Sequence, residues 1–591
     1  DYFLLFIYTI FFGVISSSLP IIYDHYFNFV TSDIETVCDV RARMDTGWVC
    51  GLRRLADDGV LYASFRGIPY AQQPLGELRF KELQPAKPWP HHLNATVEGP
   101  RCPQHDEVYG RLVTLGRGMS ESCIYANVHV PLEALPNEES GNDEARLPIL
   151  VFVHGGGFQV GAGDADLYGP EYLVSKGIVV ITFNYRINVF GFLSLNTTVI
   201  PGNAGLRDII TLLRWVRRNA EAFGGDPDDV TLGGHSAGSA AAHLVSLSDE
   251  SKGLLKRLIL MSGTAIPSFY TTSPIYAAYV ATLFFRALGI NSTDPEYIHS
   301  QLLNMSLERI MNANTIVQYE TGLVSFLPVV ESKHPGVTRV LDTDPITLLH
   351  QGRGNYPTII GTVNAECETF KWRLEYLDIL GRIKKNPLVA LSPRHAFTVS
   401  PNVGIKLAEK MIKRYFPSKL ILEKYLHLCL DTYFSHAAFK VSEWRAARRG
   451  EPVFQYLYSY ERENNVLKDS LYLKYKKVGH IEDMTMIFRP NAMLDNKNYP
   501  HSDRDYFMKE WMVNFVINFM RCSDPTCGET DAWPRVFAEL MNRQAISEAG
   551  DYFNVVPSRK ERDMIRFHDT LDEIARCVLC DRSTIHLYFN H

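Results

Sequence analysis

One stretch of the 591-residue chain, VTLGGHSAGSAAAHL over Val230–Leu244, restricts the possible folds more than any other. It begins with β-branched and apolar residues, passes through the pentapeptide GHSAG, and ends in small residues that favour a helix. A serine on a sharp turn between strand and helix needs neighbours two positions away with almost no side chain, and Gly234 and Gly238 meet that need. The stretch therefore predicts a strand–turn–helix unit that presents Ser236, although GHSAG alone also fits a glycine-rich loop.

The same alternation of strand and helix patterns continues on both sides of this stretch. Arg207–Phe223 has the apolar spacing of a helix, and short runs rich in β-branched residues predict strands. These runs are LPILVFV (147–153), GIVVITFNY (177–185), LKRLILMSG (255–263), YPTIIGTV (356–363) and PVFQYLYSY (452–460). Such alternation is typical of an α/β fold with a large, mostly parallel central sheet and helices on both faces. Chemistry is then expected beyond the carboxyl ends of the strands.

No linker-like break interrupts residues 46–567, and we expect a single catalytic domain over 46–575, preceded by an irregular lead-in over 19–45 and followed by a tail over 576–591. Hydrophobic residues make up 46% of the chain and charged residues 21%, as in ordinary globular proteins. The formal net charge is only −6 and the chain has no basic block. These features exclude a nucleic-acid partner.

The first residues indicate the compartment. The apolar run over Tyr2–Ile15 is followed by SSSLP and is shorter than the ~20 residues that span a bilayer. It predicts a signal peptide over 1–18, N-terminally incomplete because the sequence begins with Asp1; a membrane anchor is the alternative. The chain has ten cysteines, and this even number also favours secretion. We expect no stable membrane span. Four candidate glycosylation sites agree with this expectation: Asn94, Asn196, Asn291 and Asn304.

A serine hydroxyl becomes a nucleophile only with a base, a carboxylate that orients the base, and donors for the developing oxyanion. The donors are predicted in HGGGF over 154–158, where three glycines directly follow a strand and allow backbone N–H groups to approach a substrate oxygen. A competing interpretation is the partial dinucleotide-binding motif GAGDAD over 161–166. It is disfavoured because Asp166 occupies the third glycine position and the motif does not follow a strand directly.

Several further stretches resemble those of one family, the type-B carboxylesterases and cholinesterases, an α/β-hydrolase group, and most closely its insect carboxylesterases. They are FRGIPYAQQPLGELRF (65–80), SESCIYANVHVP (120–131), NYRINVFGFLS (184–194) and AFGGDPDDVTLGGHSAGSAAAHL (222–244). The resemblance extends over roughly residues 45–570. It implies the α/β-hydrolase fold and a secreted carboxylic ester hydrolase that needs no metal and no cofactor.

The resemblance also implies the catalytic residues. It places the acid at Glu366 in GTVNAECETF (361–370) and the base at His480 in KKVGHIEDMTMIF (476–488), in the hydrolase order of serine, acid and histidine. The implied oxyanion donors are the backbone N–H groups of Gly156, Gly157 and Ala237. Ser236 would attack an ester carbonyl with His480 as base, Glu366 would stabilise the imidazolium, and water would release the acyl-enzyme.

The chain departs from cholinesterases in two places that bear on the substrate. The resemblance implies a Cys102–Cys123 disulfide, but the loop between them lacks the tryptophan with which cholinesterases bind a quaternary ammonium. His235 precedes the serine where cholinesterases have glutamate, and an imidazole does not favour a cation. We therefore expect a small, uncharged and apolar ester. Juvenile hormone esterases typically have glutamine at the position of His235, so that substrate is not assigned.

Some alternatives stay open. Cys367 replaces the family's glycine after the acid, and the pairing of the eight cysteines other than Cys102 and Cys123 is unassigned, although Cys38–Cys50 and Cys522–Cys527 are candidate local bridges. CVLC over 577–580 lacks the second pair that a zinc site would need. The alternative functions are a non-catalytic cholinesterase-like adhesion protein, or a specialised hormone, pheromone or lipid esterase.

Overall fold

The computed structural model describes residues 38–105, 118–136, 146–267, 269–322, 325–494, 502–527, 533–548 and 550–576. The predicted signal peptide over 1–18, the start of the lead-in, the CVLC pair and all but the first residue of the tail lie outside these residues. In the described part of the chain, no helix combines the length and the apolar character needed to cross a membrane.

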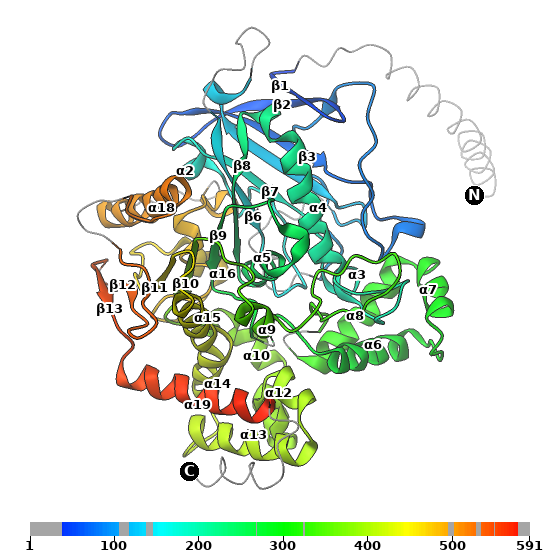
Figure 1. Ribbon diagram of the computed structural model, residues 1–591, viewed down its shortest axis with the longest axis vertical. Helices are drawn as coiled ribbons and strands as arrows, with labels where there is room; N and C mark the ends of the chain where they lie inside the picture. Colours follow the sequence, from blue (N-terminus) through cyan, green and yellow to red (C-terminus); the bar gives the residue numbers. More distant parts are fainter. Residues whose placement is uncertain are drawn as a thin grey trace, which may run out of the picture.

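The strands found among these described residues belong to one 13-stranded sheet. In chain order they are β1 (Val40–Met44), β2 (Gly47–Leu55), β3 (Leu61–Pro69), β4 (Leu93–Asn94), β5 (Tyr125–Pro131), β6 (Leu147–Val153), β7 (Val179–Phe183), β8 (Gly225–His235), β9 (Arg257–Met261), β10 (Thr358–Val363), β11 (Val453–Tyr458), β12 (Arg543–Ile546) and β13 (Tyr552–Val555). Their spatial order is β1-β2-β3-β5-β7-β6-β8-β9-β10-β11-β12-β13, with β4 paired to β2. In Figure 1 the sheet runs from β1 and β2 at the top to β12 and β13 at the left.

The α-helices lie around this sheet (Figure 1). They are α2 (Glu171–Val174), α3 (Asn188–Phe192), α4 (Ala204–Asn219), α5 (Ala237–Leu247), α6 (Pro274–Leu288), α7 (Pro295–Leu303), α8 (Leu307–Thr321), α9 (Pro345–His350), α10 (Lys371–Tyr376), α11 (Ile379–Lys385), α12 (Pro393–Thr398), α13 (Pro401–Tyr415), α14 (Leu422–Leu430), α15 (His436–Ala447), α16 (Val466–Leu471), α17 (Asn491–Leu494), α18 (Asp503–Cys522) and α19 (Arg559–Arg576). Two short helical turns matter for the site: a 3-10 turn over Glu366–Phe370 and a π-helical turn over Asp431–Ser435.

The centre of the sheet is parallel and its sides are antiparallel. Consecutive neighbours from β7 through β6, β8, β9, β10 and β11 to β12 pair in parallel, whereas β1, β2, β3, β5 and β7 pair antiparallel, as do β12 and β13. Parallel neighbours need crossover connections, and helices supply them. The predicted α/β fold with a mostly parallel central sheet is confirmed.

Strand β6 shows how both faces of the sheet are buried. Its successive side chains point to opposite faces, as the two-residue period of a strand requires. Ile149, Val151 and Val153 join the hydrophobic core that contains α4 and α5, whereas Leu150 and Phe152 join the core that contains α18. A strand buried on both faces must be apolar at every position, which explains the uninterrupted run LPILVFV.

The lead-in expected to be irregular over 19–45 ends in a strand. Strand β1 (Val40–Met44) alternates buried and exposed residues and pairs antiparallel with β2. Its exposed arginines, Arg41 and Arg43, lie over the Trp48 ring at 5.0 and 5.8 Å from the ring centroid. The sheet therefore begins before residue 46, because alternation with two charged residues still presents a continuous apolar face.

Candidate active site

The carboxyl ends of the adjacent strands β6, β8, β9 and β10 bring the predicted residues to one edge of the sheet. HGGGF follows β6, Ser236 follows β8, and Glu366 lies three residues beyond β10. His480 lies in a loop farther along the chain, between α16 and α17. This edge is where parallel α/β sheets bind ligands.

The predicted strand–turn–helix unit is confirmed between β8 and α5. Ser236 has φ 58° and ψ −127°, a strained conformation for a residue with a side chain, and its N–H donates to the Met261 carbonyl at 2.8 Å. A Cβ at Gly234 would lie 2.5 Å from the backbone of Gly238, and one at Gly238 would collide with the Val153 carbonyl. Both glycines are therefore required by close backbone contact.

The HGGGF loop packs directly on this turn. A Cβ at Gly155 would lie 3.0 Å from the Ser236 Cβ, so the two segments are in contact. Gly156 has φ 118°, and a Cβ there would collide with the Val160 carbonyl. Ala237 opens α5, so its N–H has no carbonyl one turn earlier in the helix to bond to. The loop and the helix start thus bring backbone N–H groups close to Ser236.

Glu366 and His480 form a hydrogen-bonded pair. His480 Nδ1 lies 2.6 Å from Glu366 Oε2, and neither side chain has exposed surface. The other carboxylate oxygen, Oε1, accepts from the Val363 N–H at 3.0 Å. Burial lowers the pKa of His480 because an imidazolium loses its hydration, and burial likewise raises the pKa of Glu366 against the opposing effect of the Val363 N–H.

Hydrogen bonds join the loop that carries Glu366 to the loop that carries His480. The Ala365 N–H donates to the Val478 carbonyl at 2.9 Å, and the Val478 N–H donates to Asn364 Oδ1 at 2.8 Å. The Thr369 hydroxyl donates to the His480 carbonyl at 3.3 Å. These contacts fix two segments more than a hundred residues apart in the chain, and so fix the spacing of the carboxylate and the imidazole.

Cys367, beside the acid, is bonded to Cys429 at the end of α14. The disulfide ties the acid turn to a helix that continues into the π-helical turn over Asp431–Ser435. Phe434 in that turn lies with its ring centroid 5.3 Å from that of His480. The other disulfides are Cys38–Cys50, Cys102–Cys123 and Cys522–Cys527, and no described cysteine is free.

Sequence analysis missed Tyr270. The hydroxyl of this fully buried residue donates to the Ser262 carbonyl at 3.4 Å, and burial raises the pKa of its phenol against an opposing effect of the Ser236 hydroxyl. Tyr270 lies in the loop between β9 and α6, far from every motif, so no signal in one sequence identifies it. The effect of Ser236 on this pKa makes Tyr270 a neighbour of the candidate nucleophile.

The remaining predicted positions lie on the surface. Asn94, Asn291 and Asn304 are exposed, whereas Asn196 is half-buried and its amide bonds to the Ser332 hydroxyl at 2.7 Å. Within the part of the chain that the structure describes, no group of three or more His, Cys, Asp and Glu side chains is arranged to hold a metal ion.

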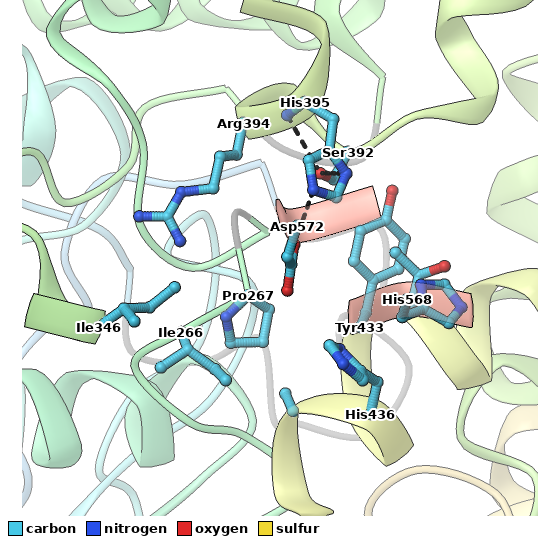
Figure 2. Close-up of a pocket in the computed structure, with 12 residues that line it drawn as sticks. Ile266, Pro267, Ile346, Ser392, Arg394, His395, Tyr433, His436, His568 and Asp572 are labelled. Atoms are coloured by element: carbon cyan, nitrogen blue, oxygen red, sulfur yellow. Dashed lines mark hydrogen bonds and ion pairs between the residues drawn. The ribbon is translucent and has the colours of Figure 1, made fainter. Parts of the chain in front are cut away.

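A second serine–histidine–carboxylate arrangement lies elsewhere, where α12 meets α19 (Figure 2). The Ser392 hydroxyl lies 3.2 Å from His395 Nδ1, and His395 Nε2 lies 2.7 Å from Asp572 Oδ1. Ser392 has the ordinary φ of −65° and caps α12. The adjoining cavity holds about 30 Å³, room for about one water molecule. This arrangement therefore anchors helices and has no space for an ester.

Comparison with known proteins identifies relatives over most of the chain. The model of the carboxylesterase family matches residues 39–561. Juvenile hormone esterase of Heliothis virescens is 48% identical over 499 residues, which are 84% of this chain and 88% of that protein. Esterase B1 of Culex pipiens is 30% identical over 511 residues, 82% of this chain and 88% of that protein. A crystal structure of juvenile hormone esterase from Manduca sexta with OTFP covalently attached is 49% identical, has a TM-score of 0.86, and covers 90% of this chain and 99% of its own.

Proposed function

The chain belongs to the carboxylesterase family and is a carboxylic ester hydrolase, and from that premise we propose that Ser236, His480 and Glu366 are its catalytic triad. The observation that carries this proposal is the buried 2.6 Å contact between His480 Nδ1 and Glu366 Oε2. It leaves His480 Nε2 buried and without a hydrogen-bond partner among the described residues, available for the proton of the nucleophile.

The reaction follows from these roles. Ser236 Oγ attacks the carbonyl carbon of the ester while His480 Nε2 takes its proton, and Glu366 stabilises the resulting imidazolium. The backbone N–H groups of Gly156, Gly157 and Ala237 bind the oxyanion of the tetrahedral intermediate. The intermediate expels the alcohol, which receives the proton from His480, and leaves an acyl-enzyme. Water then attacks the acyl carbonyl with His480 again as base, which releases the carboxylic acid and restores Ser236.

We propose that the substrate is uncharged and apolar. Support comes from the ring systems near the reacting groups: His235, Phe370 and Phe434 all contact the His480 ring. Burial and the nearby His480 hold the pKa of His235 well below its ordinary value, so it presents a neutral imidazole where cholinesterases have a carboxylate. The site therefore lacks, at this position, a carboxylate that would attract a quaternary ammonium.

One specialised substrate is favoured by a specific observation. Proteins named juvenile hormone esterase are 48% and 49% identical to this chain over most of its length. We therefore propose a juvenile hormone ester as a candidate substrate, despite His235 in the position where glutamine is typical. Purified protein should hydrolyse juvenile hormone with a higher kcat/KM than naphthyl acetate, and equal or lower kcat/KM would favour a general esterase.

We propose that the protein is secreted. The four disulfides of the described residues need an oxidising compartment, and three of the predicted glycosylation sites are exposed. Expression of the full chain in insect cells should place it in the medium with an enzymatically removable glycan mass. Retention in the cell membrane fraction would favour the anchored alternative.

Covalent labelling tests the proposed nucleophile. An organophosphate should add to Ser236 in the wild-type protein, as peptide mapping by mass spectrometry would show. Ser236→Ala should abolish the adduct, and the matched variant Ser392→Ala should keep it. Folded wild-type protein that takes no label and hydrolyses no nitrophenyl ester would instead support the non-catalytic adhesion alternative.

A further inference from the structure

His235, the last residue of β8, lies against the proposed base. Its side chain is 1% exposed, and its ring centroid is 4.3 Å from that of His480 with the planes tilted by 48°. Its Nε2 has no hydrogen-bond partner among the described residues. The close contact between the rings of His235 and His480 has no part in the mechanism above.

Two further rings complete the surroundings of His480. Phe370, in the acid turn, and Phe434, in the π-helical turn, have centroids 5.1 and 5.3 Å from the His480 centroid. The three rings come from three elements, and the Cys367–Cys429 disulfide ties the acid turn to α14, which leads directly into the π-helical turn. Glu366 bonds one nitrogen of His480, but a single hydrogen bond leaves the ring free to swing about that contact, so packing on its faces must fix its orientation.

We propose that His235 is a positioning residue for the acyl-transfer reaction: its uncharged ring packs on the His480 ring and holds the imidazole toward Ser236. This inference rests on the proposed function. His235 itself is not a second base, since its ring has no carboxylate partner comparable to Glu366. The rings of His235, Phe370 and Phe434 together present aromatic faces that stabilise the His480 imidazolium when it forms.

A charged side chain at position 235 would also change the pKa of His480. Among the described residues, Glu366 on the acid turn and His235 on β8 are the ionisable groups that face His480. Burial raises the pKa of Glu366, while the Val363 N–H and the Ser262 hydroxyl lower it. Farther from the imidazole, burial and, to a smaller extent, the charge of Glu366 raise the pKa values of Asp483 and Tyr456. The Tyr456 hydroxyl donates a hydrogen bond to Asp483 Oδ2 at 2.7 Å. A carboxylate at 235 would add a negative charge beside His480 and favour its protonated form, which cannot act as base.

Three variants separate packing from charge. His235→Phe keeps a ring and should keep kcat/KM within about threefold, whereas His235→Ala should lower kcat about tenfold or more with KM little changed. His235→Glu should move the acid limb of the kcat/KM profile upward by about one pH unit. Nitrophenyl ester hydrolysis is measured from about pH 4 to 9, with active sites counted by organophosphate titration so that folded protein alone is compared.

The inference is overturned if His235→Ala keeps the wild-type kcat, if His235→Phe is as impaired as His235→Ala, or if the His235→Glu profile superimposes on that of the wild type. Should His235→Ala fail to fold, the Phe and Glu variants still decide. Failure of the proposed function would look different, because wild-type Ser236 would then take no organophosphate label.

Discussion

Two histidine–carboxylate pairs among the described residues have similar contact distances and different surroundings. The histidine–carboxylate distance is 2.6 Å for His480 and Glu366 and 2.7 Å for His395 and Asp572. The first pair is fully buried, whereas the side chains of the second are 8% and 22% exposed. The pairs also use opposite ring nitrogens for the carboxylate, Nδ1 in the first and Nε2 in the second.

The surroundings of the two serines differ more than the contacts do. Ser236 lies on a strained turn against a glycine-rich loop, at the carboxyl edge of a parallel sheet. Ser392 caps a short helix beside a cavity of about 30 Å³. Side-chain contacts alone therefore do not make an active site. The strained turn that carries Ser236 and the glycine-rich backbone packed against it distinguish the proposed catalytic arrangement from the structural one, since Ser236 and Ser392 are equally buried at 5% exposure.

The largest expected difference concerns the two serines. Ser236→Ala should lower kcat by at least about 10⁴-fold, because the remaining groups stabilise only part of the transition state. Ser392→Ala should leave kcat within about twofold and cost about 1 kcal/mol of stability through loss of a helix cap. Steady-state hydrolysis of a nitrophenyl ester and thermal unfolding measure both effects. Comparable losses of activity in the two variants would remove the distinction drawn here.

The disulfide beside the acid should matter more than one far from it. Cys367–Cys429 closes a loop of 62 residues and Cys522–Cys527 one of 5. Replacing the first pair with alanines should cost about 4 kcal/mol of unfolding free energy and the second about 2 kcal/mol in the chain-entropy model. The first replacement should also lower kcat, since it frees the acid turn. Denaturant unfolding combined with kinetics tests this, and unchanged kcat in the first double variant would show that the acid turn is held without the disulfide.

Backbone geometry near Ser236 should be less tolerant than the same geometry elsewhere. Gly156→Ala would collide with the Val160 carbonyl and displace a proposed oxyanion donor, so kcat should fall about 10²–10³-fold. Gly253 also has positive φ, 75°, but a Cβ there meets open space. Gly253→Ala should cost about 1 kcal/mol of stability and leave kcat unchanged. If Gly156→Ala keeps full activity, the oxyanion donors lie elsewhere.

The smallest effect concerns pH. In the proposed mechanism neutral His480 is the reactive form, and burial lowers its pKa from the ordinary value of 6.5, so the protonated form accumulates only below that pH. Activity should therefore persist as the pH falls from 7 to 6 and be lost at lower pH. Asp572→Ala should leave this profile unchanged and cost about 1 kcal/mol of stability. A wild-type acid limb above 6.5 would contradict the effect of burial on His480.

The parts of the site that local sequence encodes were predictable, and those assembled from distant segments were not. Ser236 and the HGGGF loop follow their strands directly, so strand patterns and glycines locate them. Glu366 and His480 required family resemblance, because their contact joins residues 114 positions apart. The partner of Cys367, the position of Tyr270 beside Ser236 and the ring contact of His235 depend on how separate loops pack. One sequence contains no record of such packing.

Trapping the acyl-enzyme tests the central claim most directly. Protein mixed with a nitrophenyl ester, quenched in acid during the first turnover and digested should carry the acyl mass on the peptide that contains Ser236. The peptide that contains Ser392 should carry none. Acyl mass on Ser392 or on any residue other than Ser236, or rapid hydrolysis without a trapped acyl group, would contradict the assignment of Ser236 as the nucleophile.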